Sequence, residues 1–498
     1  MPNVTDLARL DATAQAQLVR AGEVSPVELV DAAIARVEQV NPALNAVIHE
    51  RFDRAHDEAS RVPDGPFRGV PVLVKDFDGP LDGEPYHLGN RLLKAVGHTA
   101  DHDSYLNAKL KAAGFVVIGK TNAPEFGLLP TTEPAAYGPT RNPWDVARSP
   151  GGSSGGSGAA VAAGMVPVAH AGDGGGSIRI PAAMCGLVGL KPTRGRVSLG
   201  PDDGEAWGGL VVRHVITRSV RDCAAVLDVL AGAMPGDPYA AAPPRRPFLE
   251  EVGAEVGPLR IGVRADTAPA GLSTVAPECV RAVTDIAAIL GEALGHEVET
   301  AGPPALDELA ALAAFTIIQA TSAAHDVARL SALVGREVGP DDVETLTWAL
   351  SERGRAIGSV EYVEALETIR AWSRRMARWW DVDGDGFDLL LTPTLAEPTP
   401  LLGDIDGDAP DPSHAEARML PFGVFTAPFN LTGQPAISIP AHLVDGLPVG
   451  IQLVAAAGRE DVLVRVAAQL EQIVPWADRT PPVFAATTTE SDRSATDG

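Results

Sequence analysis

The residues best suited to chemistry are three serines and one lysine in the first half of the chain. Ser153, Ser154 and Ser177 lie in two glycine clusters that are separated by an alanine-rich segment, and Lys75 lies upstream in the apolar run GVPVLVKD. Glycine lets a backbone turn sharply, and the start of a helix offers free backbone N–H groups. A serine nucleophile, free N–H groups and a lysine base are the parts of an acyl-transfer site.

The second glycine cluster has the pattern of a nucleophile loop. Gly174, Gly175 and Gly176 precede Ser177, and the apolar segment 178–181 follows at once. Successive glycines let backbone N–H groups converge on one point, where an oxyanion can bind. A phosphate-binding loop would carry lysine in a GxxxxGK[ST] pattern, and a flexible linker would not run into an apolar segment. We therefore expect an oxyanion hole at the three glycines.

Lys75 is the candidate base. A lysine that is removed from water at the end of a strand has its pKa lowered toward neutrality and can accept a proton. Taken alone, Lys75 would be interpreted as a surface lysine or as an ion-pair partner of Asp76; the presence of Ser177 favours the base. The six lysines of the chain are Lys75, Lys94, Lys109, Lys111, Lys120 and Lys191. All six lie between residues 75 and 191. This distribution fits a segment in which at least one lysine is kept for its chemistry, and codon usage explains it equally well.

Other kinds of site fit the sequence less well. The stretch GGSSGG matches G-x-S-x-G twice, but the strand that this motif requires is absent from the preceding RNPW. The acidic segment 381–386 resembles the opening of an EF-hand, yet Thr392 stands where a glutamate is required, so we expect an acidic turn. No histidine spacing is typical of a metal site, and we predict neither a metal nor a cofactor.

Composition limits the class of protein. The chain has 498 residues, 45% of them hydrophobic, a net charge of −25 and three widely spaced cysteines. Such a charge disfavours nucleic acid and anionic membranes as partners. We find no run of 18 apolar residues and no signal peptide. These observations predict a cytoplasmic enzyme that acts on a small molecule.

Strand-like and helix-like segments alternate, which predicts an α/β fold. A capping box at Ser25 begins a helix that Asn41-Pro42 should end. Strands are expected at 69–74, 115–118, 187–190, 259–263, 388–391, 436–440 and 448–454, and further helices at 359–380 and 461–473.

Several blocks resemble the amidase signature family in their order along nearly the whole chain. They are GVPVLVKD, GKTNAPEF, RNPWDVARSPGGSSGGSGAAVAAG, GDGGGSIRIPAAMCGLVGLKPT, DLLLTPT, GQPAISIP and GLPVGIQL. The resemblance implies a mixed central sheet covered by helices on both faces, and a homodimer. It implies a single domain over residues 1–484, with a helical layer at about 1–65, a signature core at about 66–230 and a remainder at about 259–484. We expect the polar tail 485–498 to be disordered.

The resemblance also implies roles for the site residues. Ser177 would be the nucleophile, Ser153 a bridging serine in a cis peptide bond, and Lys75 the base. Ser154 would support the proton relay by hydrogen bonding, and Asp173 with Arg179 would brace the loop.

The sequence departs from the family pattern at two places. Ala171-Gly172 stands where the family usually has Gly-Thr, and Gly174 occupies a position that often carries a side chain. Both changes make the loop smaller and alter the pocket beside the oxyanion hole.

The blocks DATAQAQLVRAGEVSPVEL, TTEPAAYGPTRNPW and GREDVLVRVAAQLEQIVPWADRTPP are most similar to the 6-aminohexanoate cyclic-dimer hydrolase group of the family. This implies an amidohydrolase of nylon oligomers. General or aryl-acyl amidase activity, carbamate hydrolysis, and the amidase subunit of a tRNA-dependent amidotransferase are alternatives, of which the charge disfavours the last. A non-catalytic scaffold is disfavoured by the intact serines and lysine. Phe126, Tyr137, Trp207 and the region 315–321 are candidates to line the pocket.

Overall fold

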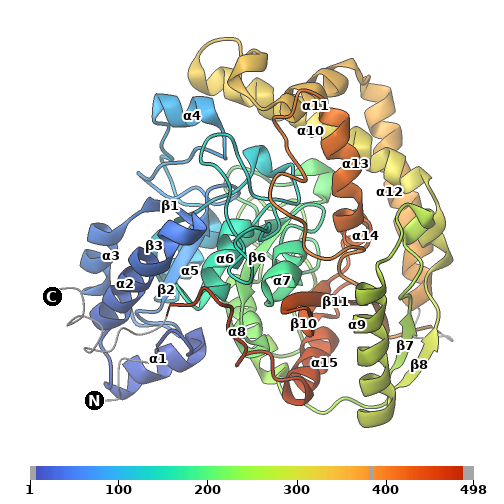
Figure 1. The fold of residues 1–498 in the computed structure, drawn as a ribbon, viewed down its shortest axis with the longest axis horizontal. Coiled ribbons are helices and arrows are strands. Elements are labelled where there is room, and N and C mark those ends of the chain that lie inside the picture. The colour runs from blue at the N-terminus through green and yellow to red at the C-terminus, as the bar shows by residue number, and fades with distance from the viewer. Residues whose placement is uncertain (1–6, 381–385, 486–498) are drawn as a thin grey trace.

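The structure, a computed structural model, describes residues 7–380 and 386–485. Its strands form one mixed sheet (Figure 1). Its order is β1-β3-β2-β4-β6-β5-β10-β11-β9-β7-β8. The strands are β1 (Val47–Glu50), β2 (Pro71–Lys75), β3 (Val116–Thr121), β4 (Val168–Asp173), β5 (Val188–Lys191), β6 (Val212–Thr217), β7 (Arg260–Val263), β8 (Glu297–Thr300), β9 (Leu389–Pro393), β10 (Ala436–Val444) and β11 (Leu447–Ala455). Strand β2 is parallel to β3 and β4, whereas β10 is antiparallel to β5 and β11.

Helices connect the strands and pack around the sheet. They are α1 (Ala12–Ala21), α2 (Pro26–Leu44), α3 (Phe52–Ala59), α4 (Arg91–Val96), α5 (Tyr105–Ala112), α6 (Gly155–Ala162), α7 (Arg179–Cys185), α8 (Val220–Leu230), α9 (Pro277–Ala288), α10 (Ala310–Val334), α11 (Thr345–Ala356), α12 (Ser359–Ala377), α13 (Pro412–Gly423), α14 (Ala427–Thr432) and α15 (Glu460–Ile473). Within the ranges that the structure describes, none of them is long and apolar enough to cross a membrane.

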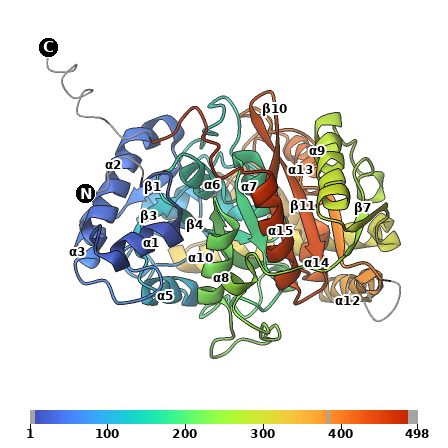
Figure 2. The ribbon, with the colours of Figure 1, turned by 90° about the horizontal axis from the view of Figure 1, so that it is seen from below.

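Alternating side chains divide the core between the two faces of the sheet. In β2, Val72 and Val74 belong to the apolar cluster that includes α8, α9 and α15, whereas Leu73 belongs to the cluster with α2 and α6. Successive residues of a strand point to opposite faces, which explains this division. Figure 2 shows α8, α15 and α9 along one face. The expected α/β fold with helices on both faces is therefore confirmed.

The predicted end of α2 was wrong. The helix continues through Pro42 and ends at Leu44, which is fully buried. A proline inside a helix removes one N–H and hence one backbone hydrogen bond. Here the loss falls in the last turn, where the Asn41 side chain accepts hydrogen bonds at 2.8 Å from the N–H groups of Ala46 and Val47.

The boundary of the tail also needs correction. Ala485, expected as its first residue, is buried, and its N–H donates to the Ala163 carbonyl at 2.9 Å. Residues 486–498, and residues 381–385 of the expected acidic turn, lie outside the described residues.

The topology brings the candidate site residues to one edge of the sheet. Strands β2 and β4 are parallel neighbours, so their carboxyl ends lie at the same edge. Strand β2 ends at Lys75 and β4 ends at Asp173, from which the glycine loop leads into α7. Helix α6 begins directly after Ser154. Regular elements thus fix both ends of the segments that carry the candidate residues.

Candidate active site

Lys75 and Ser153 form a buried hydrogen-bonded pair. The Lys75 ammonium nitrogen donates to the Ser153 hydroxyl at 2.6 Å, and Lys75 has no exposed surface. The peptide bond between Gly152 and Ser153 is cis, as the resemblance implies. Burial lowers the pKa of Lys75 to about 8, against the opposing effect of the nearby Asp78 and Asp173 carboxylates. A lysine in this state can exchange a proton with a serine hydroxyl near neutral pH.

The simpler interpretation of Lys75 as a partner of Asp76 does not hold. The Asp76 carboxylate instead accepts a hydrogen bond at 2.7 Å from Lys120, which is also buried. Asp76 further accepts the N–H of His87 at 3.3 Å. Because Lys120 balances the charge of Asp76, Lys75 is left to Ser153.

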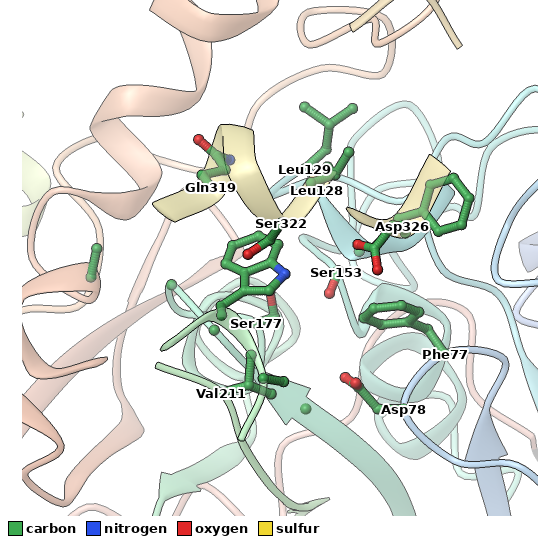
Figure 3. A pocket seen from close by; sticks show the side chains of 18 of the residues that line it. Phe77, Asp78, Leu128, Leu129, Ser153, Ser177, Val211, Gln319, Ser322 and Asp326 are labelled. Atoms are coloured by element: carbon green, nitrogen blue, oxygen red, sulfur yellow. The ribbon is translucent and has the colours of Figure 1, made fainter. Parts of the chain in front are cut away.

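Ser177 lies in the glycine loop at the start of α7, is half-buried, and lines the same cavity as Ser153 (Figure 3). The N–H groups of Gly174, Gly175 and Gly176 donate to no acceptor within the described residues. These N–H groups are therefore free to bind an oxyanion.

Gly176 is required by its conformation and by its surroundings. Its φ is +140°, and a Cβ atom there would lie 2.4 Å from the Thr426 hydroxyl oxygen and 2.7 Å from Ile180 Cδ1. The same Thr426 hydroxyl donates to the Gly175 carbonyl at 2.6 Å. A side chain at position 176 would push the loop away from this anchor.

Asp173 and Arg179 form an ion pair that joins the two ends of the glycine loop. The Arg179 guanidinium donates to both Asp173 carboxylate oxygens, at 2.9 and 3.0 Å, and neither side chain is exposed. The N–H of Ile178 donates to the same carboxylate at 3.2 Å. Burial alone would raise the pKa of Asp173, but Arg179 lowers it to about 2. The Asp173 carboxylate that anchors the glycine loop is therefore charged.

Two polar residues from distant elements complete this network, and the sequence did not single them out. The Asn430 amide donates to the Asp173 carboxylate at 2.8 Å, and its oxygen accepts from Arg179 at 2.6 Å. The Gln452 oxygen accepts from Arg179 at 2.7 Å. Gln452 belongs to the block GLPVGIQL, one of those that carry the family resemblance, so the sequence offered a signal for it. Nothing in the sequence marked Asn430.

Ser154 contacts the backbone of strand β4. Its hydroxyl donates to the Gly172 carbonyl at 3.4 Å, so it joins the start of α6 to strand β4. Its hydrogen-bond partner among the described residues is thus a backbone group, and neither Ser153 nor Ser177.

The cavity has a volume of about 640 Å³. Phe126, Trp207 and Phe315 line it, as expected, together with the carboxylates of Asp78 and Asp326. Tyr137 does not belong to its lining. The Tyr137 hydroxyl instead contacts the imidazoles of His49 and His87. Among the described residues, no group of three or more His, Cys, Asp or Glu side chains is arranged to hold a metal ion.

The sequence and the fold match those of known proteins. The family model described as Amidase matches residues 28–464. The chain therefore belongs to the amidase family and hydrolyses amide bonds.

Particular relatives narrow the comparison. The chain is 45% identical over 485 residues to a 6-aminohexanoate-cyclic-dimer hydrolase of Paenarthrobacter ureafaciens, with 95% of this chain and 97% of that protein covered. The solved structure of a 6-aminohexanoate cyclic dimer hydrolase complexed with substrate matches with a TM-score of 0.92 and 44% identity, covering 96% of this chain and 99% of that one. A bacterial aryl acylamidase structure matches with a TM-score of 0.84 and 30% identity, covering 94% and 98%.

Proposed function

We propose that the chain hydrolyses amides through an acyl-enzyme on Ser177, with Ser153 and Lys75 as the proton relay. Neutral Lys75 takes a proton from Ser153, which takes one from Ser177. The Ser177 oxygen then attacks the amide carbonyl, and the C–N bond breaks as the relay returns the proton to the leaving nitrogen. The relay then takes a proton from a water molecule, whose oxygen bonds to the acyl carbon. The ester bond to Ser177 breaks as the relay returns the proton to the Ser177 oxygen, and the carboxylic acid leaves.

The observation that carries this proposal is the pairing of Lys75 with Ser153. A fully buried lysine hydrogen-bonded at 2.6 Å to a serine in a cavity that Ser177 also lines is the arrangement that a relay requires. The nucleophile is in turn adjacent to free N–H groups. In this proposal Gly174, Gly175 and Gly176 bind the oxyanion, and one such donor is worth roughly 10²–10³ in rate.

The bracing residues support the geometry of this loop. Arg179 and Asp173 act as positioning residues, since they hold both ends of the glycine loop without lining the cavity. Ser154 supports the site through the backbone of β4.

For the substrate, we propose an amide of the 6-aminohexanoate type. The similarity to proteins named for that cyclic dimer supports it, as does a cavity of about 640 Å³ that is lined in part by Phe126, Trp207 and Phe315. The aromatic wall of Trp207 and Phe315, with the likeness to an aryl acylamidase, favours an anilide as the second candidate.

A substrate panel tests both parts. Wild-type protein and Ser177→Ala are compared on the cyclic and linear 6-aminohexanoate dimers, an aliphatic amide, an anilide and a carbamate. We expect the dimers to be hydrolysed and this activity to vanish in Ser177→Ala. Turnover of the anilide or carbamate alone would overturn the substrate, and equal activity of the two proteins would overturn the nucleophile.

We further propose a single-domain enzyme that forms a homodimer in the cytoplasm. The sequence resemblance supports the dimer, and the three buried free cysteines, Cys185, Cys223 and Cys279, are compatible with a reducing compartment. Light scattering coupled to gel filtration tests the dimer; a monomer mass would contradict it.

A further inference from the structure

One wall of the cavity is acidic. We call its three carboxylates, Asp78, Asp203 and Asp326, the acidic subsite; all three line the cavity. Figure 3 shows the carboxylates of Asp78 and Asp326 on either side of Phe77, with Ser153 between this group and Ser177. The Lys75 nitrogen lies 5.3 Å from the centre of the Phe77 ring. The acidic subsite is thus on the Lys75–Ser153 side of the nucleophile.

Asp78 is a buried carboxylate without a hydrogen-bond donor. Its residue is 8% exposed, and within the described part of the chain it accepts no hydrogen bond. The nearest cation, a terminal nitrogen of Arg213, is 3.8 Å away. Because Asp78 lines the cavity, a ligand there can supply the donors that this carboxylate does not receive from the protein.

The backbone conformation of Asp78 and the lack of a side chain at Gly172 together allow the position of this carboxylate. Asp78 has a φ of +67°, a conformation that residues with side chains seldom adopt. A Cβ atom at Gly172 would lie 2.2 Å from the Asp78 Oδ2 atom. The absence of a side chain at Gly172 therefore makes room for the Asp78 carboxylate.

Asp326 reaches the same wall from helix α10. The cavity is lined by Phe315, Gln319, Ser322 and Asp326, whose spacing of four, three and four residues places them on one face of that helix. Asp326 forms no hydrogen bond or ion pair with any described residue. Burial raises the pKa of the Asp326 carboxyl to about 7, against the attraction of Arg329.

The two arginines that lie near the acidic subsite balance its charge only in part. Arg213 donates at 2.6 Å to the Leu199 carbonyl and lies 3.5 Å from Asp203. Arg329 lies 3.7 Å from Asp203, and about half of its side chain is exposed. Both guanidinium groups are closest to Asp203, so Asp78 and Asp326 keep acceptor capacity on the cavity side.

We propose that the acidic subsite binds an alkylammonium group, namely the amine that the reaction releases. This inference rests on the proposed relay, in which the leaving nitrogen receives its proton from Ser153, beside Asp78. The released amine then takes a second proton from solvent and becomes an ammonium ion. In a cyclic amide that amine stays tethered to the acyl-enzyme, and holding it as ammonium prevents its attack on the ester. The acyl-enzyme ester is then hydrolysed by water.

Binding to the catalytically disabled protein tests the proposal. Ser177→Ala is titrated in a calorimeter with hexylammonium, with its neutral isostere hexan-1-ol and with hexanoate. We expect hexylammonium to bind at least tenfold more tightly than hexan-1-ol, and hexanoate to bind most weakly. Adding Asp78→Asn or Asp326→Asn to this variant should lower the affinity for hexylammonium at least tenfold and change the affinity for hexan-1-ol less than twofold. Asparagine tolerates a positive φ well, so Asp78→Asn keeps the backbone.

Glu416→Gln is the matched control, because Glu416 also lines the cavity but is paired with Arg353 at 2.8 Å. It should leave the hexylammonium affinity unchanged. Equal affinities for hexylammonium and hexan-1-ol, or an equal loss in Glu416→Gln and Asp78→Asn, would overturn the acidic subsite. The titration needs no turnover, so its outcome is separate from the fate of Ser177 as nucleophile.

Discussion

At the scale of single residues, the environment of Lys75 decides what the site can do. An exposed lysine is a cation at neutral pH, but burial lowers the pKa of Lys75 to about 8. The Asp78 and Asp173 carboxylates oppose that shift, so they favour the protonated form that arises once Lys75 has taken a proton from Ser153. The side chain can therefore exist in both of the states that a relay needs.

This pKa predicts the pH dependence of the reaction. The base must be neutral, so kcat/KM should rise tenfold per pH unit below about 8 and level off above it. Lys75→Arg keeps the charge but stays protonated, and it should lower kcat/KM by roughly 10²–10⁴ at every pH. A wild-type profile that is flat from pH 6 to 9 would contradict a lysine base.

If Lys75 and Ser153 act as one unit, their losses should not add. Lys75→Met and Ser153→Ala should each lower kcat by roughly 10²–10⁴, and the double variant should be little worse than either single one. Rates of amide hydrolysis for the four proteins give the comparison. Losses that multiply in the double variant would separate the two residues into independent roles.

Residue types and short spacings allowed the prediction of Lys75 and Ser177, because each lies in a local pattern that the chemistry requires. The role of Ser153 was implied by the family resemblance. Asn430 and Asp78 were not predicted. Asn430 meets Asp173 across 257 positions of sequence, and the position of Asp78 depends on the absence of a side chain at Gly172. Such partners are selected by folding and leave no local pattern.

At the scale of elements, the glycine loop is held between strand β4 and helix α7 by one buried ion pair. Asp173 ends β4 and Arg179 begins α7, so their pairing fixes the span of the loop between them. Removing one member of a buried pair leaves the other charge without its partner, which is far more costly than losing a surface pair.

Asp173→Asn should therefore lower the free energy of unfolding by about 3 kcal/mol. Unfolding in urea, followed by circular dichroism, measures the change. Glu367→Gln is the matched control, because the Glu367–Arg370 pair at 2.7 Å has both side chains more than half exposed. It should change stability by less than about 1 kcal/mol. Equal losses in the two variants would show that burial of the Asp173–Arg179 pair is unimportant.

The elements themselves followed from sequence patterns more closely than their ends did. The strand around 69–74 and the helix at 461–473 are present as β2 and α15, because period and propensity act locally. The end of α2 was missed because burial of Leu44 and the Asn41 side chain stabilise a last turn that contains Pro42.

At the scale of the whole molecule, the order of the sheet joins distant parts of the chain. Strand β5 lies between β6 and β10, although β10 begins more than two hundred residues later. Patterns along the chain indicate strands, but their order depends on which faces pack together, and the family resemblance supplied only the class of sheet. The cavity likewise combines the 126–130 segment and α10, which include the expected lining residues Phe126 and Phe315, with α13, which was not expected there.

A buried carboxyl pair joins these distant parts. Glu125, next to the cavity residue Phe126, accepts hydrogen bonds from the Asn90 amide and from the Glu344 N–H, both at 2.7 Å. Burial raises the pKa of Glu125 to about 7, and burial together with the Glu125 charge raises that of Glu344 to about 8. In the unfolded chain both carboxyls titrate near their ordinary values of about 4.5.

This pair makes stability depend on pH. Between about pH 4.5 and 8 the folded protein binds more protons than the unfolded chain, so its stability falls as the pH rises. The contribution is fully present below about 4.5 and is lost through pH 7–8. Glu344→Gln should reduce this fall, by on the order of 2 kcal/mol, in urea unfolding at pH 5 and pH 9. An unchanged difference between the two pH values would contradict the account.

The most direct test of the account as a whole is to locate the nucleophile by covalent labelling. A fluorophosphonate reacts with an activated serine by forming an O–P bond and releasing fluoride. Peptide mass spectrometry of the labelled wild-type protein should find the adduct on Ser177, and Ser177→Ala should remain unlabelled. Lys75→Met should label at least a hundredfold more slowly. An adduct on Ser153, or labelling of Ser177→Ala at the wild-type rate, would contradict the assignment of Ser177 as the nucleophile.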